Sequence, residues 1–283
     1  MAPPIYAGPV EKTWYYSFRG ICALIFLFLI GPLFIIVPLS FNAEPYFNFS
    51  PEMLSLDPAG FSTRWYADFW NDANWMLAVQ NSFIIAIFAT LISTTLGTLA
   101  ALGLSRSEMP FKTLVMALMI SPMIVPLIIS AAGMYFFYSR IGLASTHVGV
   151  ILAHAALGTP FVVITVTATL VGFDHSLTRA AANLGAHPTT VFFKIIVPLI
   201  LPGVISGALF AFITSFDEVV VVLFVGSVEQ RTIPWAMFSG IREEISPTIL
   251  AVATLLITLS ILLLTTLELL RRRNEKMRGL SPG

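Results

Sequence analysis

The adjacent carboxylates Asp217 and Glu218 are the side chains of this sequence best placed for chemistry. They directly follow residues 195–216, an apolar run long enough to cross a membrane. Counted from Pro198, position 217 lies about 28 Å along a helix that rises 1.5 Å per residue. An acidic side chain at such depth costs about 2–3 kcal/mol on insertion scales and normally faces a cavity or a partner. The pair predicts either a path for a cationic solute or a structural pair bonded to a partner chain or to helix ends.

Other reactive patterns are absent or weak. The sequence has no Gly-Lys pair, and therefore no nucleotide-binding P-loop, and it has no H-E-x-x-H zinc motif. His147 and His154 stand seven residues apart without a carboxylate nearby, so buried polar packing is a better interpretation than a metal site. We expect no catalytic residue, no metal and no cofactor in this chain.

Composition places the protein in a membrane. Of the 283 residues, 57% are hydrophobic and 11% are charged, whereas an average soluble domain is about 25% charged. The net charge is zero, so nothing indicates a nucleic-acid partner. Six stretches without charge are each at least 22 residues long, and about 20 apolar residues cross a bilayer core as a helix. The predicted fold class is an all-α integral membrane protein with six transmembrane helices, at residues 20–43, 73–105, 113–139, 141–173, 195–216 and 245–267.

The basic residues predict the orientation of the chain in lipid. With six spans both termini lie on one side, and eleven of the 15 Lys and Arg residues share that side. The positive-inside rule then places both termini in the cytoplasm. The predicted order is a cytoplasmic tail, a first span, a periplasmic loop, a region with the other five spans and a second cytoplasmic tail, at residues 1–18, 19–43, 44–75, 76–270 and 271–283.

Two segments on the outer side carry aromatic residues. In the first outer loop, Ser62 is a capping residue, and Trp65, Phe69 and Trp70 recur at helical spacing. We expect a short helix that lies on the outer membrane surface and is packed by these side chains. The polar, turn-rich segment 226–247 is either a docking surface for a binding protein or a simple loop.

Prolines and glycines mark places where helices bend or pack closely. Pro122 and Pro126 interrupt the third span, which predicts either a kinked gate helix or simple curvature. Gly203 and Gly207 form a G-x-x-x-G pair on the fifth span. This pair predicts close helix packing, which a sliding gate also needs.

Residues 174–194, between the fourth and fifth spans, contain a short amphipathic helix. Its apolar positions follow the i, i+3, i+4, i+7 pattern of one helix face. They are Leu177, Ala180, Ala181 and Leu184. Nothing in the loop itself can bury this face, so the helix either enters a groove on a partner or lies on lipid.

Turn-forming residues delimit this helix. Asp174 or Ser176 caps its start. Gly185 permits a left-handed or closely packed turn. We expect Pro188 to end the helix, and one of the two threonines at 189–190 to cap the next one.

The stretch AAANLGAHPTTVFFKIIVPLILPGVISG resembles the cytoplasmic EAA loop of the membrane subunits of ABC importers. The family's pattern is Glu-Ala-Ala, then Gly, then, after a spacer, an apolar residue followed by Leu-Pro. The matching residues are Ala180, Ala181, Gly185, Pro198, Pro202 and Gly203. The resemblance implies that residues 174–190 form a coupling helix, which docks into a groove on the ATPase subunit and transmits its closure.

One position departs from the family's pattern. Arg179 stands where the family has the glutamate of the motif. In the family that glutamate helps to hold the helix against the ATPase, so the charge reversal changes this contact. A compensating acidic residue on the ATPase that serves this chain is our hypothesis.

A longer resemblance covers residues 61–270. The stretches RWYADFW, LGTPFVVI and SFDEVVVVLFV, together with residues 81–106, are similar to the C-type membrane subunit of spermidine/putrescine permeases. That family implies one peripheral helix followed by a five-helix core, in a bacterial inner membrane. It also implies alternating access by a heterodimer with a homologous permease chain, two ATPase chains that bind ATP and Mg, and a periplasmic substrate-binding protein.

The predicted function is ATP-driven import of a polyamine or a similar small cationic solute. Three alternatives stay open. A related importer would carry another amine-bearing solute, such as an amino acid, an opine or an aminophosphonate. An ion-coupled secondary transporter would use Asp217 and Glu218 as its ion site. A membrane scaffold that transports nothing would leave the coupling motif without a reason.

Overall fold

The computed structural model describes residues 8–106, 108–174, 176–243 and 246–277, which form parts of two compact units. The first unit comprises Met1–Asp72 and Gly240–Gly283, and the second comprises Ala73–Ser239. In the described ranges the regular elements are helical, apart from one isolated bridge between Asn42 and Phe61. The predicted all-α class is confirmed.

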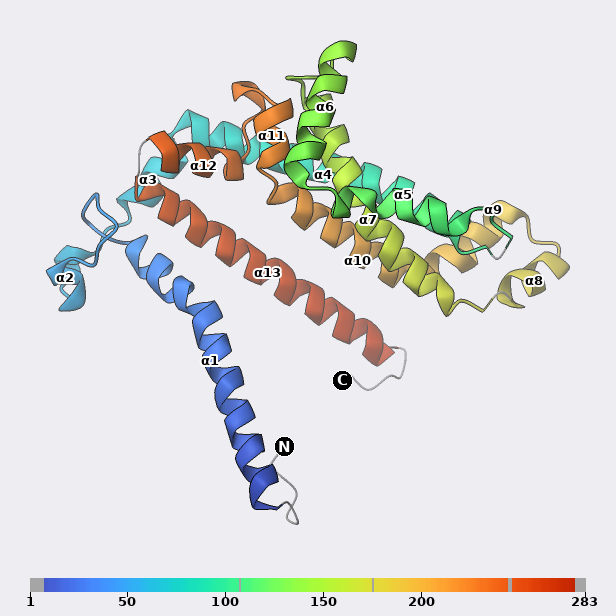
Figure 1. The fold of residues 1–283 in the computed structure, drawn as a ribbon, viewed down its shortest axis with the longest axis horizontal. Coiled ribbons are helices and arrows are strands. Elements are labelled where there is room, and N and C mark those ends of the chain that lie inside the picture. Colours follow the sequence, from blue (N-terminus) through green and yellow to red (C-terminus); the bar gives the residue numbers. More distant parts are fainter. Residues whose placement is uncertain (1–7, 107, 175, 244–245, 278–283) are drawn as a thin grey trace. The chain divides into compact units, whose positions relative to one another are not determined.

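The first unit is built around two long helices. Helices α1 (Pro9–Leu39) and α13 (Thr248–Met277) contact one another, and α3 (Arg64–Asn71) packs on α13 (Figure 1). Between α1 and α3 lie the short helices α2 (Pro51–Leu54) and η1 (Pro58–Gly60). Because Pro9 is pre-organised for the first helical turn, α1 begins inside the stretch 1–18 that the sequence assigned to a polar tail.

The helix predicted in residues 44–75 is present as α3. Thr63 is its N-cap residue but makes no side-chain cap hydrogen bond, whereas the Ser62 Oγ accepts the backbone N–H of Arg64, the first residue of α3, at 3.2 Å. Ser62 therefore satisfies a donor at the start of the helix, as predicted, from one residue before the N-cap position. The side chains of Trp65 and Phe69 are buried, as packing by aromatic residues requires. The Trp65 Nε1–H also donates to the carbonyl of Asn42 at 2.8 Å. Trp70 is 58% exposed, but its ring meets the Phe69 ring edge-to-face, with centroids 5.0 Å apart.

The second unit has a core of three long helices. Helices α4, α7 and α10 each contact the other two (Figure 1). Its described helices, in chain order, are α4 (Ala73–Leu104), α5 (Lys112–Ile124), α6 (Leu127–Ile141), α7 (His147–Val171), α8 (Ser176–Asn183), α9 (Pro188–Val191), the π-helix η2 (Phe192–Ile196), α10 (Val197–Phe216), α11 (Val220–Val225), η3 (Val228–Gln230) and α12 (Ile233–Glu243), whose last residues belong to the first unit.

The third predicted span is divided into two helices. Five described helices are long and apolar enough to cross a membrane, and α5 and α6 pass the same test only as a pair that is bent by 101°. The bend falls at Val125, which is extended with φ −70° and ψ 134°. The ring of Pro126 disfavours a helical conformation at Val125, whereas Pro122 stays inside α5. Counting the bent pair as one span gives the predicted six.

Glycines allow α10 to approach α7 closely. A Cβ atom on Gly207 would lie 2.8 Å from the Val162 Cα, and a Cβ on Gly203 would overlap the Thr169 side chain. Neither position has room for any side chain unless the helices separate. The G-x-x-x-G pair therefore lies in a tight helix contact, while its role in gating stays a prediction.

Gly207→Ala should destabilise the protein by about 1–3 kcal/mol, because the added methyl overpacks the contact between α7 and α10. The measurement is the thermal unfolding midpoint in detergent. Gly103→Ala is the matched control, since a Cβ there meets no atom within 4 Å. Equal midpoints for the two variants would contradict the tight contact.

Candidate functional site

A short helix, α8 (Ser176–Asn183), lies within residues 174–190, where the sequence predicts the coupling helix. The Asp174 Oδ1 accepts the backbone N–H of Ser176 at 2.8 Å, and its Oδ2 accepts the Ser176 hydroxyl at 2.7 Å. This arrangement satisfies a donor at the start of the helix, as the capping prediction requires. An acidic side chain at this end also complements the helix dipole.

A glycine turn ends α8, and the predicted role of Pro188 is wrong. Gly185 has a φ of +81°, and two backbone hydrogen bonds close the turn, from Ala186 to Ala181 and from Gly185 to Ala182. This pattern is the Schellman motif, which ends helices at a left-handed glycine.

Pro188 instead begins the next helix. It occupies the first turn of α9, where a missing N–H costs nothing. His187 is the N-cap residue of α9, so neither threonine of 189–190 has that role.

The apolar face of α8 is uncovered within this chain. Leu177 is 44% exposed and Leu184, one residue beyond the helix, is 88% exposed. Arg179 and Ala180 are also exposed, and Ala181 is half-buried. The structure thus presents Leu177 and Arg179 on a short, well-delimited helix and Leu184 directly after it.

A π-helical segment joins this region to α10. Residues Phe192–Ile196 adopt the wider π geometry directly before Val197. Pro198 has no N–H for the carbonyl four residues earlier, on Lys194, and its ring clashes with that carbonyl in a regular α-helix. Widening the preceding turn relieves this clash, as π-bulges in α-helices do. Pro202 is accommodated within α10.

The predicted carboxylate pair lies at the far end of α10, and the two side chains differ in environment. Glu218 is 8% exposed, and its Oε1 accepts the backbone N–H of Val221 at 2.9 Å, which caps α11. Glu218 lies beyond the span Pro188–Phe216, and burial raises the pKa of its carboxyl, against the lowering effect of backbone N–H groups. Asp217 is exposed. Among the described residues none donates a hydrogen bond to its carboxylate.

Two polar contacts near this end of α10 were not predicted from the sequence. The Nδ1 of His154, a residue only 1% exposed on α7, lies 2.9 Å from the Ser215 Oγ on α10. The Nε2 of the same ring is buried without a partner among the described residues. The histidine was predicted to pack as a buried polar group, but its partner is 61 residues away and has no signal in the sequence.

Asn81 is the second missed residue. Its Nδ2 donates to the carbonyls of Glu229 and Arg231 at 2.7 and 2.9 Å, and its Oδ1 lies 2.9 Å from the Nε2 of His147. The neighbouring Ser82 Oγ accepts the backbone N–H of Ile233 at 2.8 Å. These contacts fix residues 229–233, near the start of the polar segment predicted on the outer side, to α4 and α7. The sequence feature that could have identified this anchor is the Asn-Ser pair at residues 81–82, which interrupts an apolar run.

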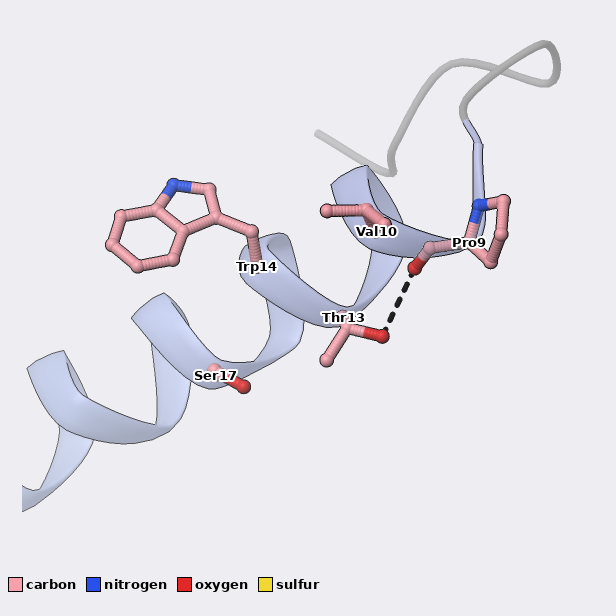
Figure 2. Close-up of a pocket in the computed structure, with 5 residues that line it drawn as sticks. All are labelled: Pro9, Val10, Thr13, Trp14 and Ser17. Atoms are coloured by element: carbon pink, nitrogen blue, oxygen red, sulfur yellow. Dashed lines mark hydrogen bonds between the residues drawn. The ribbon is translucent and has the colours of Figure 1, made fainter.

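A shallow hollow on α1 is separate from these features. Figure 2 shows that its lining residues, which include Pro9 and Trp14, all come from one helix. The Thr13 hydroxyl donates to the Pro9 carbonyl at 2.9 Å. The lining carries no ionisable side chain, so we assign no chemistry to it.

Comparison with known proteins places these features in a family. Residues 93–276 match the family described as binding-protein-dependent transport system inner membrane component. The spermidine/putrescine transport system permease protein PotC of Haemophilus influenzae is 34% identical over 252 residues, covering 89% of this chain and 95% of that protein. The putrescine transport system permease protein PotI of Escherichia coli is 34% identical over 239 residues, covering 82% of each.

Solved structures show the same fold at low identity. A bacterial ABC transporter involved in the import of the acidic polysaccharide alginate matches with a TM-score of 0.73 and 14% identity, covering 94% of this chain and 99% of that chain. An amino acid ABC transporter matches with a TM-score of 0.52 and 18% identity, covering 74% of this chain and 95% of that chain.

Asn81→Leu should lower the thermal unfolding midpoint and expose the segment 226–233 to protease. The change leaves two backbone carbonyls and His147 without their partner, at a cost of about 1–3 kcal/mol per unsatisfied buried group. Thr95→Ala is the control, because that exposed hydroxyl bonds only to its own helix, at the Leu91 carbonyl. Unchanged proteolysis in Asn81→Leu would contradict the anchoring role.

Proposed function

The chain belongs to the family of binding-protein-dependent transport system inner membrane components, and on that premise we propose that this permease subunit of an ABC importer carries polyamines. The observation that supports this cargo most strongly is the similarity to PotC, which extends over 89% of this chain and so includes both ends of α10. An exposed carboxylate at the outer end of α10 fits a cationic solute. The function of this subunit is transport and not catalysis of a bond-making reaction.

The assembly that we propose has five parts. This chain forms a heterodimer with a homologous permease chain, and two ATPase chains bind ATP and Mg on the cytoplasmic side. A periplasmic binding protein delivers the cargo. The basic residues gathered on the side of the termini support a cytoplasmic location of both termini in the inner membrane. A solved relative of the same fold was crystallised with its periplasmic protein bound.

The mechanism is alternating access driven through α8. Closure of the ATPases moves α8, whose exposed Leu177 and Leu184 are the groups that a partner groove would bury. Through α9 and the π segment this movement reaches α10, and the glycine contacts make α7 follow α10. Asp217 and Glu218 lie on the cargo path, with Glu218 supporting the α11 cap.

The break at Pro126 and the close contacts at Gly203 and Gly207 serve the gate. Pro122 lies inside α5 and Pro202 inside α10, two helices of the proposed gate, and Pro198 follows the π segment at the coupling end. Hinge and shear movements of packed helices are established ways of domain rearrangement. In this proposal Pro122, Pro126, Pro198 and Pro202 all serve the helix movements of the transport cycle.

Uptake of labelled spermidine and putrescine tests the proposed cargo. Cells that express this chain with its neighbouring transport genes should take up both compounds saturably, and cells that lack only this chain should not. Only cations should compete. Competition by amino acids, opines or aminophosphonates would keep the importer and overturn the cargo. Uptake that stops with an uncoupler and needs no ATPase gene would instead favour the secondary transporter.

Arg179→Glu should lower cargo-stimulated ATP hydrolysis severalfold, because it places a negative charge against the acidic residue that we propose on the ATPase. Arg179→Lys should keep most of the activity. Arg106→Glu is the control, since Arg106 is an exposed cation on the same side but outside α8. Unchanged hydrolysis in Arg179→Glu would show that this position does not contribute to coupling.

A further inference from the structure

The break between α5 and α6, at Val125 and Pro126, lies inside the apolar part of the membrane. Helix α5 has 13 residues, so at 1.5 Å per residue it covers about 20 Å from Lys112 even if it stands upright. The hydrocarbon core of a bilayer is about 30 Å thick. Beyond the break, Leu127 packs on the buried cluster that includes Leu157, a residue near the middle of α7. The chain therefore breaks its helix well before it has crossed the membrane.

The break leaves three consecutive backbone carbonyls without hydrogen-bond partners. Pro126 has no N–H to donate to the carbonyl of Pro122, four residues earlier. The carbonyls of Met123 and Ile124 likewise accept no hydrogen bond from any described residue, because the chain bends by 101° before their usual donors. The last turn of α5 thus ends in acceptors that the described part of the chain does not satisfy.

The described part of the chain does not cover the break. Ile124 is 75% exposed, Val125 39% and Ile128 58%. The backbone N–H groups of Leu127 and Ile128, in the first turn of α6, also have no partner among the described residues. Lipid tails cannot satisfy any of these groups, so irregular backbone at this depth is found only where protein buries it or where it lines a water-filled path. The break therefore faces either a partner chain or water.

The side of α6 that begins at the break continues into a cavity. Ala132, Tyr135 and Phe136 follow Ile128 by four, seven and eight residues, so all four lie on one side of the helix. The cavity has a volume of about 540 Å³, and its lining includes these three residues and Leu223 of α11. Open space along the same helix side favours a water-filled path over a closely packed partner chain.

The groups at the break favour a cationic solute. A helix C-terminus carries partial negative charge, and its last carbonyls are acceptors without donors. A primary ammonium group has three N–H donors and no acceptor, which matches three adjacent carbonyls. Interrupted membrane helices hold cations through unwound carbonyls and helix C-termini. The rings of Tyr135 and Phe136, farther along α6, offer faces for the charge and the methylene groups of an alkylamine.

We propose that the break between α5 and α6 lines the water-filled path of the cargo, and that the carbonyls of Pro122, Met123 and Ile124 bind one of its ammonium groups. The proposal rests on the proposed function for its ligand, a protonated alkylamine. Water satisfies the N–H groups at the start of α6 while the cargo occupies the carbonyls. Because every residue type has a carbonyl, the side chains of such a site carry no sequence signal, and the proline that frees the carbonyls is its one mark.

Cysteine modification in the assembled importer tests the position of the break. The chain carries Cys22→Ser to remove its single cysteine, and it is assembled with its permease partner and the ATPases in lipid nanodiscs, which leave both membrane faces open. Val125→Cys is treated with the cationic methanethiosulfonate MTSET or the anionic MTSES, with and without ATP, and the remaining thiol is counted by the gel shift of this chain with a maleimide-linked polymer. Relative to a free thiol in water, MTSET should react about tenfold faster than MTSES, because the helix C-terminus attracts the cation.

Matched variants guard the interpretation. Leu91→Cys is the control, because this side chain is 57% exposed but lies on the unbroken helix α4, and neither reagent should modify it. Ile128→Cys repeats the test if Val125→Cys does not assemble. Spermidine should slow the reaction of MTSET with Val125→Cys severalfold, by occupying the carbonyls. Equal rates for Val125→Cys and Leu91→Cys, or no reaction at Val125→Cys and Ile128→Cys in assembled complexes, would show that a partner chain or lipid covers the break and would overturn the proposal.

Uptake by the complete importer, with its binding protein in liposomes, keeps the two proposals distinguishable. Spermidine that is transported but does not slow the reaction of MTSET leaves the proposed function in place and overturns the carbonyl site. An importer that takes up neither spermidine nor putrescine removes the proposed cargo. Preferential reaction of MTSET with Val125→Cys in that importer would still support the break as a part of the path that accepts cations.

Discussion

Close backbone contact between α7 and α10 is the constraint on which the rest of this structure depends. Lipid tails are as apolar as leucine, so packing and interhelical hydrogen bonds, not water exclusion, hold such helices together. Gly203 and Gly207 remove the side chains that would keep α10 away from α7. Gly97 on α4 faces Val162 of α7 in the same way. Through these contacts α10 packs directly on α7 between the α8–η2 region and Asp217.

The two halves of this helix core are held by different interactions. Gly203 meets Thr169 and Gly207 meets Thr165, in the later part of α7, where small residues permit close approach. Toward the start of α7 the helices are joined by hydrogen bonds, between His154 and Ser215 and from the Ser93 hydroxyl to the Ala155 carbonyl. Interhelical hydrogen bonds specify geometry more sharply than apolar packing does. The end with the carboxylates is therefore held by these hydrogen bonds together with the close approach of Gly158 to Ala211.

Sequence patterns were sufficient wherever one local effect dominated. Long uncharged stretches predicted the spans, and Gly185 predicted the turn after α8 because left-handed φ values favour glycine. Patterns failed where two local effects compete. Pro188 can stop one helix or start the next, and the left-handed turn at Gly185 had already ended α8 before it. Ser62 caps α3 from one residue before the N-cap position, a shift of register that sequence spacing does not reveal.

The remaining features depend on tertiary structure. The partnership of His154 with Ser215 and the meeting of Phe83 with Phe216 join positions far apart in the chain. No periodicity within one helix specifies such pairs. The difference between Asp217 and Glu218 is similar, because two neighbouring carboxylates become distinct only when α11 begins beside one of them.

The π-helical segment Phe192–Ile196 also affects how far the chain before it is rotated about the axis of α10. An α-helix turns about 100° for each residue, and a π-bulge accommodates one extra residue without that rotation. The direction in which α8 faces around the axis of α10 therefore depends on how many residues separate Gly185 from Pro198. A chimaera that exchanges coupling segments between relatives must preserve this number. A single deletion in the regular turn Pro188–Val191 would aim the same α8 surface about 100° away, with every contact residue still present, whereas the loss of one residue from the π segment would restore the α-helical count and keep the direction.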